Sequence, residues 1–461
     1  MAKKPQTVWI CQECGYESPK YMGRCICGAW NSFVEEKVLP APQEDTRRRT
    51  AGRAAGRSSR PIPLKSVTSA DRGRIPTAIR ELDRVLGGGL VKGSLTLISG
   101  EPGIGKSTLI IQAAAEIARS FGTVLYVSGE ESEEQIKMRA DRVCSGIPDS
   151  LLVMSETNID NVLTVAEDIK PVFLIVDSIQ TMYTDQLDSA PGSVSQVRAC
   201  GGILMKIGKT NDIPIFIVAH VTKSGDLAGP KIVEHLVDCV LSFSGERDHE
   251  IRILRAFKNR FGTTSEIGAF RMENEGMIGI EDLSGTFLEN PDEQQEGSVV
   301  TAVYEGSRPV LLEIQALTAQ ANVGFPRRTA VGIDYQRLNM ILAVLEKRAG
   351  IPVSTEDVYA NVVGGLKPDS TSVDLGVALA VYSSVRRIKP AAGMIAIGEV
   401  GLTGGLRSVQ NADKIAVEAA KLGYTKILMP KKNAERIKNV PKGCKIVGLK
   451  DIIDAVEAFK Y

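Results

Sequence analysis

Residues 95–108 read LTLISGEPGIGKST, and this stretch decides the fold of the region around it. An apolar run of strand length, residues 95–99, leads into a glycine-rich loop, and a helical pattern over residues 107–119 follows. The loop has the spacing G-x-x-x-x-G-K-S, which between a strand and a helix is typical of a phosphate-binding P-loop. Its glycines let backbone N–H groups surround phosphate oxygens, and the start of the helix adds a positive dipole.

Each part of this loop has an expected role. Lys106 should reach the β- and γ-phosphates of a nucleoside triphosphate, and Ser107 should ligate Mg²⁺. The sequence therefore predicts ATP and Mg²⁺ as ligands. The predicted nucleotide-binding residues of the loop are Gly100, Glu101, Pro102, Gly103, Ile104, Gly105, Lys106, Ser107 and Thr108.

Strand and helix patterns alternate on both sides of the loop, from about residue 66 to 285. Further strands are expected at residues 124–128, 151–154, 172–177 and 213–220, and helices at 133–143, 159–169 and 194–209. Buried apolar runs joined by helices predict an α/β domain with a parallel sheet. After Cys239, closely spaced strands at 240–244 and 251–257 are expected as antiparallel additions at one edge.

Polar residues stand at the carboxyl ends of three of these strands, where parallel sheets bind ligands. Asp177 is expected to hold the water shell of the metal ion. Glu130 or Glu131 is expected to orient the attacking water, although acidic residues here could also simply begin the next helix. His220 could sense the γ-phosphate or be purely structural, and the pattern favours neither.

Four of the eight cysteines lie within the first 27 residues, as Cys11-x-x-Cys14 and Cys25-x-Cys27. Four thiolates at this spacing predict a tetrahedral Zn²⁺ site, and the alternative is a reduced loop without metal. Residues 36–65 follow, rich in proline and arginine, with little to bury. They should form a flexible linker, either simply solvated or acting as a phosphate-contacting arm.

The bulk composition sets limits on the class of protein. A chain of 461 residues should form two or three domains, and its formal net charge of +1 gives no overall field for nucleic acid. The longest apolar runs, such as residues 172–176, are far shorter than the ~18 residues of a membrane span. With no secretory signal and clustered cysteines, we expect a cytoplasmic protein without membrane contact.

The segments 82–90 (LDRVLGGGL), 93–94 and 100–108 together resemble the opening of RecA-like ATPases. With the cysteine cluster and Lys258-Asn259-Arg260-Phe261-Gly262, nearly the whole chain resembles the RadA (Sms) family of bacterial DNA-repair and recombination proteins. The family has C-x-x-C where this chain has the shorter Cys25-x-Cys27. The resemblance implies a ring-forming homo-oligomer, a hexamer, that binds single-stranded and branched DNA and works with the recombinase RecA.

The resemblance also assigns roles to residues. Glu130 takes the position of the catalytic base, and Lys258 and Arg260 match positions that reach the ATP of a neighbouring subunit. Without the resemblance, these two cations would be interpreted as a basic strand end at the surface. The loops at residues 186–194 and 222–230 match those that hold DNA in RecA-like proteins.

Residues from about 298 onward resemble the catalytic domain of Lon protease, through segments 367–372, 398–404 and 413–422. Ser372 falls at the nucleophile position, but the lysine position is Ile415. Lys414 is one residue away, which is about 100° around a helix, so we expect no peptidase activity. The domain should be a ring scaffold with a DNA-binding surface. The candidate contacts are Arg327, Arg328, Arg386, Arg387 and Lys389, each of which could equally be a solvated surface charge.

These expectations combine into a domain plan and a function. The plan is a C4 zinc finger (1–35), a basic linker (36–65), a RecA-like α/β ATPase domain (66–289) and an α+β Lon-protease-like domain (290–461). The leading hypothesis is a DNA-dependent ATPase that drives processing or branch migration of recombination intermediates as a ring-shaped motor. The alternatives are an ATP-dependent Lon-like protease and a RecA-fold nucleotide switch like KaiC, whose ATPase would be indifferent to single-stranded DNA.

Overall fold

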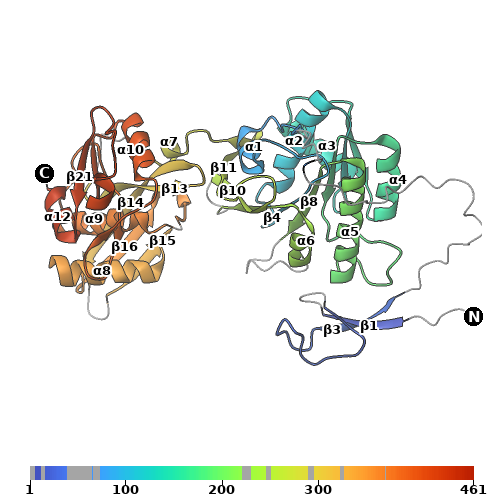
Figure 1. The fold of residues 1–461 in the computed structure, drawn as a ribbon, viewed down its shortest axis with the longest axis horizontal. Helices are drawn as coiled ribbons and strands as arrows, with labels where there is room; N and C mark the ends of the chain where they lie inside the picture. Colours follow the sequence, from blue (N-terminus) through green and yellow to red (C-terminus); the bar gives the residue numbers. More distant parts are fainter. Residues whose placement is uncertain are drawn as a thin grey trace, which may run out of the picture. The chain divides into compact units, whose positions relative to one another are not determined.

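The computed structural model describes residues 6–11, 16–38, 65, 73–220, 230–245, 251–288, 295–321, 326–368 and 370–460. The described residues form a small amino-terminal ribbon, a nine-stranded sheet and a seven-stranded sheet (Figure 1). Contacts divide the chain into two compact units, of which the second comprises Gly245–Ile251, Ser265–Ala269 and Ile280–Tyr461.

The amino-terminal ribbon is an antiparallel sheet in the order β2-β1-β3. Its strands are β1 (Gln6–Cys11), β2 (Glu17–Ser18) and β3 (Phe33–Val38). Because β3 pairs with β1 as far as Val38, the ribbon runs past residue 35, where the linker was expected to begin. Cys14 and most of the expected linker lie outside the described residues.

The nine-stranded sheet has the order β12-β11-β10-β9-β4-β8-β7-β5-β6. The six strands from β9 to β6 are mutually parallel. The strands are β4 (Leu95–Gly100), β5 (Val124–Ser128), β6 (Leu151–Ser155), β7 (Phe173–Asp177), β8 (Ile215–His220), β9 (Cys239–Ser244), β10 (Ile251–Asn259), β11 (Ile267–Glu273) and β12 (Gly276–Gly279).

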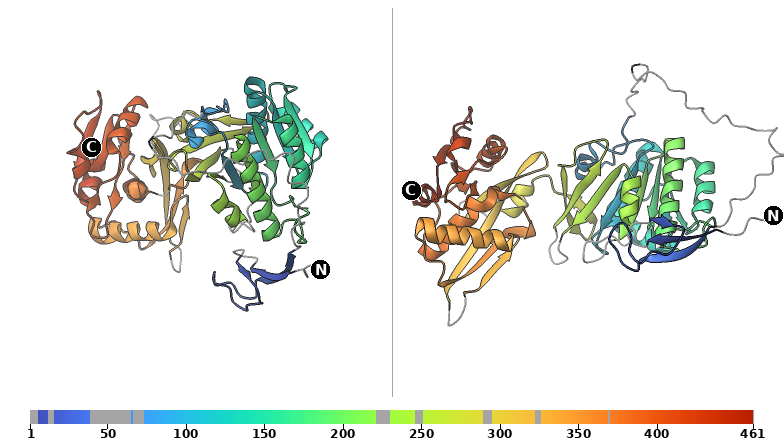
Figure 2. Two further views of the ribbon diagram at one scale, coloured as in Figure 1. Left: turned by 45° about the vertical axis from the view of Figure 1, so that its right-hand side comes forward. Right: turned by 60° about the horizontal axis from the view of Figure 1, so that its bottom comes forward.

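Helices cover both faces of this sheet (Figures 1 and 2). Alternate residues of a strand point to opposite faces, so Ile175 of β7 joins one core while Leu174 joins the other. The first core also takes in α2 and α3, and the second α4 and α5. The helices are α1 (Arg80–Leu86), α2 (Lys106–Phe121), α3 (Glu133–Val143), α4 (Ile159–Ile169), α5 (Val194–Asn211) and α6 (Pro230–Leu236).

One expectation about this sheet is wrong. Strand β9 was expected to be antiparallel, but it pairs in parallel with β4, as Leu97 with Val240. The physical reason is α6, a helix of 7 residues between β8 and β9. This helix returns the chain to the end of the sheet at which the parallel strands begin, so β9 runs in the same direction as β4. Strand β10 does add to β9 in the antiparallel sense, as expected.

The second unit contains a seven-stranded sheet in the order β15-β16-β14-β13-β17-β20-β21. Helix α9 packs against β13 and β14 and is covered by α8 and α12. The strands are β13 (Ser298–Glu305), β14 (Arg308–Gln320), β15 (Arg328–Val331), β16 (Glu356–Val362), β17 (Met394–Ala396), β20 (Lys426–Pro430) and β21 (Lys445–Leu449), and a separate pair is β18 (Glu399–Val400) with β19 (Leu406–Arg407).

Helices of the second unit lie against both faces of its sheet (Figure 2). They are α7 (Leu283–Phe287), α8 (Tyr335–Ala349), α9 (Asp374–Arg386), α10 (Ala412–Lys421), α11 (Lys431–Ala434) and α12 (Ile452–Phe459), with 3₁₀ turns at Val363–Gly365 and Thr371–Val373. In the part of the chain that the structure describes, no helix has both the length and the apolar character needed to cross a bilayer.

Candidate nucleotide-binding site

The glycine-rich loop joins β4 to α2, as the motif predicts. Gly103 and Gly105 have φ angles of 80° and 110°, a left-handed region that favours glycine. A β-carbon on Gly105 would lie 2.6 Å from the Met272 methyl carbon, the flexible end of a side chain, so the φ angle rather than this contact is what requires glycine here. Gly105 is the N-cap of α2, and therefore the helix begins at Lys106 with its first N–H groups beside the loop.

Lys106 is held inside this loop. Its side-chain ammonium donates to the carbonyl oxygens of Gly100 (2.7 Å) and Glu101 (3.0 Å). Burial lowers the pKa of Lys106 to about 8, although the charges of Asp177 and Glu130 act in the opposite direction. The lysine is thus a cation close to its point of proton loss, facing the carboxylates that line the pocket.

Asp177 stands at the end of β7 and accepts two hydrogen bonds on one oxygen. Ser107 Oγ donates to Oδ2 at 2.7 Å, and the Tyr126 hydroxyl donates to the same atom at 2.5 Å. Burial and the charge of Asp177 raise the pKa of Tyr126 well above its usual value, so the phenol keeps its proton. A hydroxyl and a carboxylate within contact form the oxygen-rich arrangement that Mg²⁺ prefers.

Glu130 and Glu131 follow β5 but do not begin α3. The N-cap is Ser132, which forms a reciprocal capping box with Gln135, so both glutamates precede the helix. Their carboxylates have different partners. Ser178 Oγ donates to Glu130 at 2.5 Å, whereas Glu131 forms an ion pair with Arg139 of α3.

His220 lies at the end of β8, paired with Gly100 at the start of the loop. Its Nε2 is 3.5 Å from a carboxylate oxygen of Glu130. The Gln180 side chain fixes the His220 backbone, donating to its carbonyl at 3.0 Å and accepting from its N–H at 3.3 Å. This placement puts the imidazole beside the loop and Glu130 together.

These groups line one pocket of about 420 Å³, which contains Lys106, Ser107, Glu130, Asp177 and His220. The sequence analysis missed four polar residues of this region: Tyr126, Arg139, Ser178 and Gln180. A tyrosine in the otherwise aliphatic strand β5 was a usable signal, because a buried phenol needs a hydrogen-bond acceptor. Ser178 and Gln180 find their partners, Glu130 and His220, only when β7 lies beside β5 and β8, and Arg139 finds Glu131 only when α3 folds back on the loop that precedes it.

The pocket lies at the carboxyl ends of the parallel strands, whereas the segment Lys258–Gly262 lies at their amino ends. The Arg260 N–H donates to the carbonyl of Asp238, which itself bonds Leu95 at the start of β4. The glycine-rich loop begins five residues later, about 16 Å farther along the strand. Lys258 donates to the carbonyl of Glu234 at 2.8 Å, and Arg260 pairs with the Asp238 carboxylate at 3.1 Å.

The same segment packs on the turn that ends α1. The Asn259 side chain donates to the carbonyl of Val85 at 3.2 Å, and Gly262 lies against Gly87. Gly87 has a φ of 82° and caps α1 in the left-handed conformation. The two segments that carry the family resemblance therefore contact each other.

In the ribbon, the sulfur atoms of Cys11, Cys25 and Cys27 lie within 4.8 Å of one another, with 3.9 Å between Cys11 and Cys27. Four thiolates around one zinc ion stand roughly 3.8 Å apart, so this spacing fits a metal. The predicted ligand Cys14 lies outside the described residues.

In the second unit, the residues at the Lon-like positions do not meet. Ser372 is buried and donates to the carbonyl of Ala302 at 3.0 Å. Ile415 is fully buried in the core between α10 and the sheet. Lys414 is exposed and reaches the Tyr304 hydroxyl at 2.8 Å. The serine therefore has no lysine partner among the residues that the structure describes.

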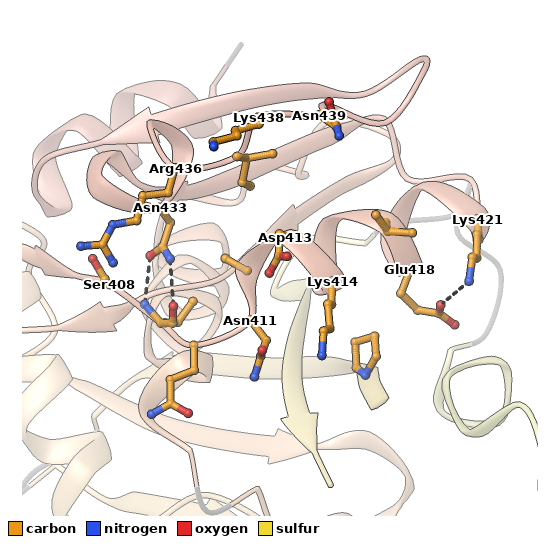
Figure 3. Close-up of a pocket in the computed structure, with 16 residues that line it drawn as sticks. Ser408, Asn411, Asp413, Lys414, Glu418, Lys421, Asn433, Arg436, Lys438 and Asn439 are labelled. Atoms are coloured by element: carbon orange, nitrogen blue, oxygen red, sulfur yellow. Dashed lines mark hydrogen bonds and ion pairs between the residues drawn. The ribbon is translucent and has the colours of Figure 1, made fainter. Parts of the chain in front are cut away.

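A larger pocket, of about 1040 Å³, lies on the outer side of α10 (Figure 3). Asn433 fixes its wall with two hydrogen bonds to the backbone of Val409, at 2.9 and 2.8 Å. The charged groups lining it come from α10 and from the segment after α11, and they are Asp413, Lys414, Glu418, Lys421, Arg436 and Lys438. It has no paired hydroxyl and carboxylate like Ser107 and Asp177, so the smaller pocket is the candidate site.

Among the basic residues proposed as DNA contacts, Arg328 has structural partners. Its guanidinium donates to the carbonyls of Glu356 and Val353, the latter at 2.7 Å, and so ties β15 to the start of β16. Arg386, Arg387 and Lys389 are exposed at the end of α9. The loop expected at residues 222–230 falls almost entirely outside the described residues.

Comparison with known proteins gives three family matches along the chain. An AAA domain model matches residues 58–226, a model of subunit ChlI of Mg-chelatase matches residues 316–433, and a rubredoxin metal binding domain model matches residues 9–35. Among solved structures, a KaiC-like protein from Pyrococcus horikoshii OT3 is 18% identical with a TM-score of 0.38, covering 45% of this chain and 99% of its own.

Relatives match over nearly the full length. The DNA repair protein RadA of Bacillus subtilis is 48% identical, with 98% of each chain covered. The proteins of the same description from Halalkalibacterium halodurans and Streptococcus pyogenes serotype M6 are 46% and 48% identical, with 99% of each chain covered. On this identity and coverage, the chain belongs to the family of the DNA repair protein RadA.

Proposed function

We propose that this protein is a DNA-dependent ATPase that acts in homologous recombination and DNA repair. It binds single-stranded DNA and drives the processing or branch migration of recombination intermediates as a ring-shaped motor. The observation that carries the proposal is the meeting of Lys106, Ser107, Asp177 and Glu130 in one pocket. The family's name, DNA repair protein, supports the biological setting.

The residues of the pocket divide the chemistry of hydrolysis. The loop N–H groups and Lys106 bind the phosphates, and Ser107 with Asp177 holds Mg²⁺, which neutralises charge on the transferring phosphoryl group. Tyr126 fixes the Asp177 carboxylate in place.

Glu130 is the better candidate for orienting the attacking water. Its side chain is 42% exposed toward the pocket and its described partners are a hydroxyl and an imidazole. The Glu131 carboxylate instead forms an ion pair with Arg139 and is already engaged by that side chain.

The position of Lys258 and Arg260 supports an oligomer. An arginine side chain spans roughly 7 Å, less than half of the ~16 Å of strand between Arg260 and the loop of its own chain. These cations could act on a phosphoryl group only in a neighbouring copy, as the family resemblance implies. A cation inserted from a neighbour stabilises transition-state charge and couples hydrolysis to a subunit interface. We therefore infer a ring, with six subunits by resemblance.

The DNA-binding part of the proposal rests on charge. Arg386, Arg387 and Lys389 form an exposed basic end of α9, suited to phosphate contact without base recognition. Single-stranded and branched DNA, with RecA as a protein partner, are the partners that the family resemblance implies. Arg328 is a poorer candidate than the α9 group because backbone carbonyls already engage its guanidinium.

For the ribbon we propose a structural Zn²⁺ held by Cys11, Cys14, Cys25 and Cys27. The sulfur spacing of the three described ligands supports it. The ribbon core contains few apolar side chains, and in so small a domain metal binding supplies much of the folding free energy.

The test of the proposed function is the rate of ATP hydrolysis with and without single-stranded DNA. Wild type should be stimulated by the DNA, and Lys258→Ala should lose the stimulation together with most of the turnover. Lys209→Ala is the matched control, because Lys209 is an exposed lysine at the end of α5, away from the pocket. A wild-type rate that does not change with DNA would favour the nucleotide-switch hypothesis. Full activity of Lys258→Ala would contradict the motor hypothesis.

A further inference from the structure

Arg139 of α3 is a cation of the nucleotide pocket to which neither the motif nor the resemblance gives a role. It lines the pocket together with Lys106 and Asp177, but it comes from α3, which packs against α2. One end of its guanidinium bonds Glu131. Burial opposes the charge of Arg139, yet the hydrogen bond and charge of Glu131 raise its pKa, so the cation is permanent.

The other end of the same guanidinium lacks an acceptor. Nη1 is buried and has no hydrogen-bond partner among the residues that the structure describes. A buried donor without an acceptor costs about 1–3 kcal/mol of stability, and more when the group is charged. The side chain as a whole is 20% exposed, so the guanidinium is neither free in solvent nor fully satisfied by the protein.

The neighbours of Arg139 indicate which part of a nucleotide would supply the acceptor. They include Glu131, next to the Glu130 proposed to orient water, and Tyr126 and Asp177, on the Mg²⁺ side of the pocket. By the roles proposed above, these groups would surround the reacting end of the phosphate chain and not the base. A guanidinium matches a phosphate in geometry because it presents two parallel N–H donors.

We propose that Arg139 binds the terminal phosphate of ATP from within the same chain, with Glu131 holding the guanidinium in place. The inference rests on the proposed ATPase function and adds a second intrachain cation to Lys106. In this arrangement Glu131 positions Arg139 and takes no part in proton transfer. The chain then distinguishes ATP from ADP before any neighbouring subunit contributes Lys258 or Arg260.

The test compares the dissociation constants of Arg139→Gln for ADP and for the β,γ-imido analogue of ATP, both with Mg²⁺. Loss of a charged hydrogen bond predicts about 10-fold weaker binding of the ATP analogue. Binding of ADP should change less than about twofold, since ADP lacks the terminal phosphate. Lys137→Gln is the matched control, because Lys137 lies on the same helix, exposed and paired with Asp141. Equal losses for both nucleotides, or no loss, would overturn the assignment.

Two further variants separate binding from folding and from the proposed function. Arg139→Lys keeps the charge but not the paired donors, so it should keep the thermal unfolding midpoint of wild type without nucleotide and still bind the ATP analogue more weakly. A normal midpoint with wild-type affinity would contradict the proposal. Lys106→Ala tests the site itself. If Lys106→Ala keeps the wild-type affinity for the ATP analogue, the assignment of the pocket as an ATPase site fails. If Lys106→Ala loses affinity and Arg139→Gln keeps it, only the role of Arg139 is wrong.

Discussion

The nucleotide pocket and the region around Ser372 each have a serine at the start of a helix and a candidate lysine partner, Lys106 or Lys414, but only in the pocket do serine and lysine lie in one site. In the pocket, Ser107 Oγ donates to the Asp177 carboxylate, and Lys106 is 3% exposed and bonded to carbonyls of the glycine-rich loop. In the second unit, Ser372 donates to the carbonyl of Ala302, and Lys414 points out to Tyr304.

The two regions differ in the hydrogen-bond partner of the serine and in the direction of the lysine side chain, not in the types of residue present. A hydroxyl bonded to a carboxylate can exchange that bond for a metal ion, while a hydroxyl bonded to a buried carbonyl is satisfied where it is. A lysine one position along α10 faces a different side of the helix, so the core position is left to Ile415. The comparison therefore predicts that the chemistry of this chain is confined to the first region.

The largest expected effect comes from exchanging the two lysines for alanine. Lys106→Ala should reduce ATP turnover by about 100-fold or more, because the pocket loses the cation that we propose binds the phosphates. Lys414→Ala should leave turnover within about twofold, because neither Lys414 nor its partner Tyr304 lines the nucleotide pocket. Steady-state ATP hydrolysis checks both. An equal loss in both variants would mean that the comparison between the regions is wrong.

The second prediction restores a lysine at the Lon-like position. Ile415→Lys should destabilise the protein by about 3 kcal/mol or more, because the fully buried site offers a charge no partner. It should produce no ATP-dependent casein cleavage, since Ser372 remains bonded to Ala302. Thermal unfolding and a casein assay measure the two outcomes. Ile415→Val, at about 1 kcal/mol, is the control for size alone. Casein cleavage by Ile415→Lys would show that the serine is available after all.

The contrast also explains what could be predicted from sequence. The expected strands and helices of the first sheet end within two residues of the observed ones from β4 to β8, because each depends on a local run of apolar residues. Lys106 and Asp177 were predictable for the same reason, since loop and strand end are local signals. The Glu131–Arg139 ion pair was not predictable, because the sequence spacing does not indicate which cation will pair with a given carboxylate. The direction of β9 was missed because it depends on the short helix α6.

The third prediction concerns pH and applies to the pocket alone. The pKa of Lys106 is lowered to about 8 by burial, so the ammonium is charged at pH 7 and mostly neutral at pH 9. Attraction for ATP is present below the pKa and lost above it, and the dissociation constant should rise about 10-fold between pH 7 and 9. Titration with ATP at both pH values measures the change. Lys106→Arg should show no such rise, because arginine does not titrate in this range; a flat wild-type profile would contradict the assigned cause.

The smallest expected effect is that of Ser372→Ala, and it tests the second region most directly. If Ser372 is purely structural, its loss removes the hydrogen bond to the buried carbonyl of Ala302 and the one that the Ser370 hydroxyl donates to Ser372, which together cost about 1–2 kcal/mol. ATP turnover should stay at the wild-type level, and the unfolding midpoint should fall by a few degrees at most. Ser408→Ala, at an exposed serine, should leave the midpoint unchanged. A fall in catalysis without a fall in stability would give Ser372 a chemical role that its bond to a backbone carbonyl does not support.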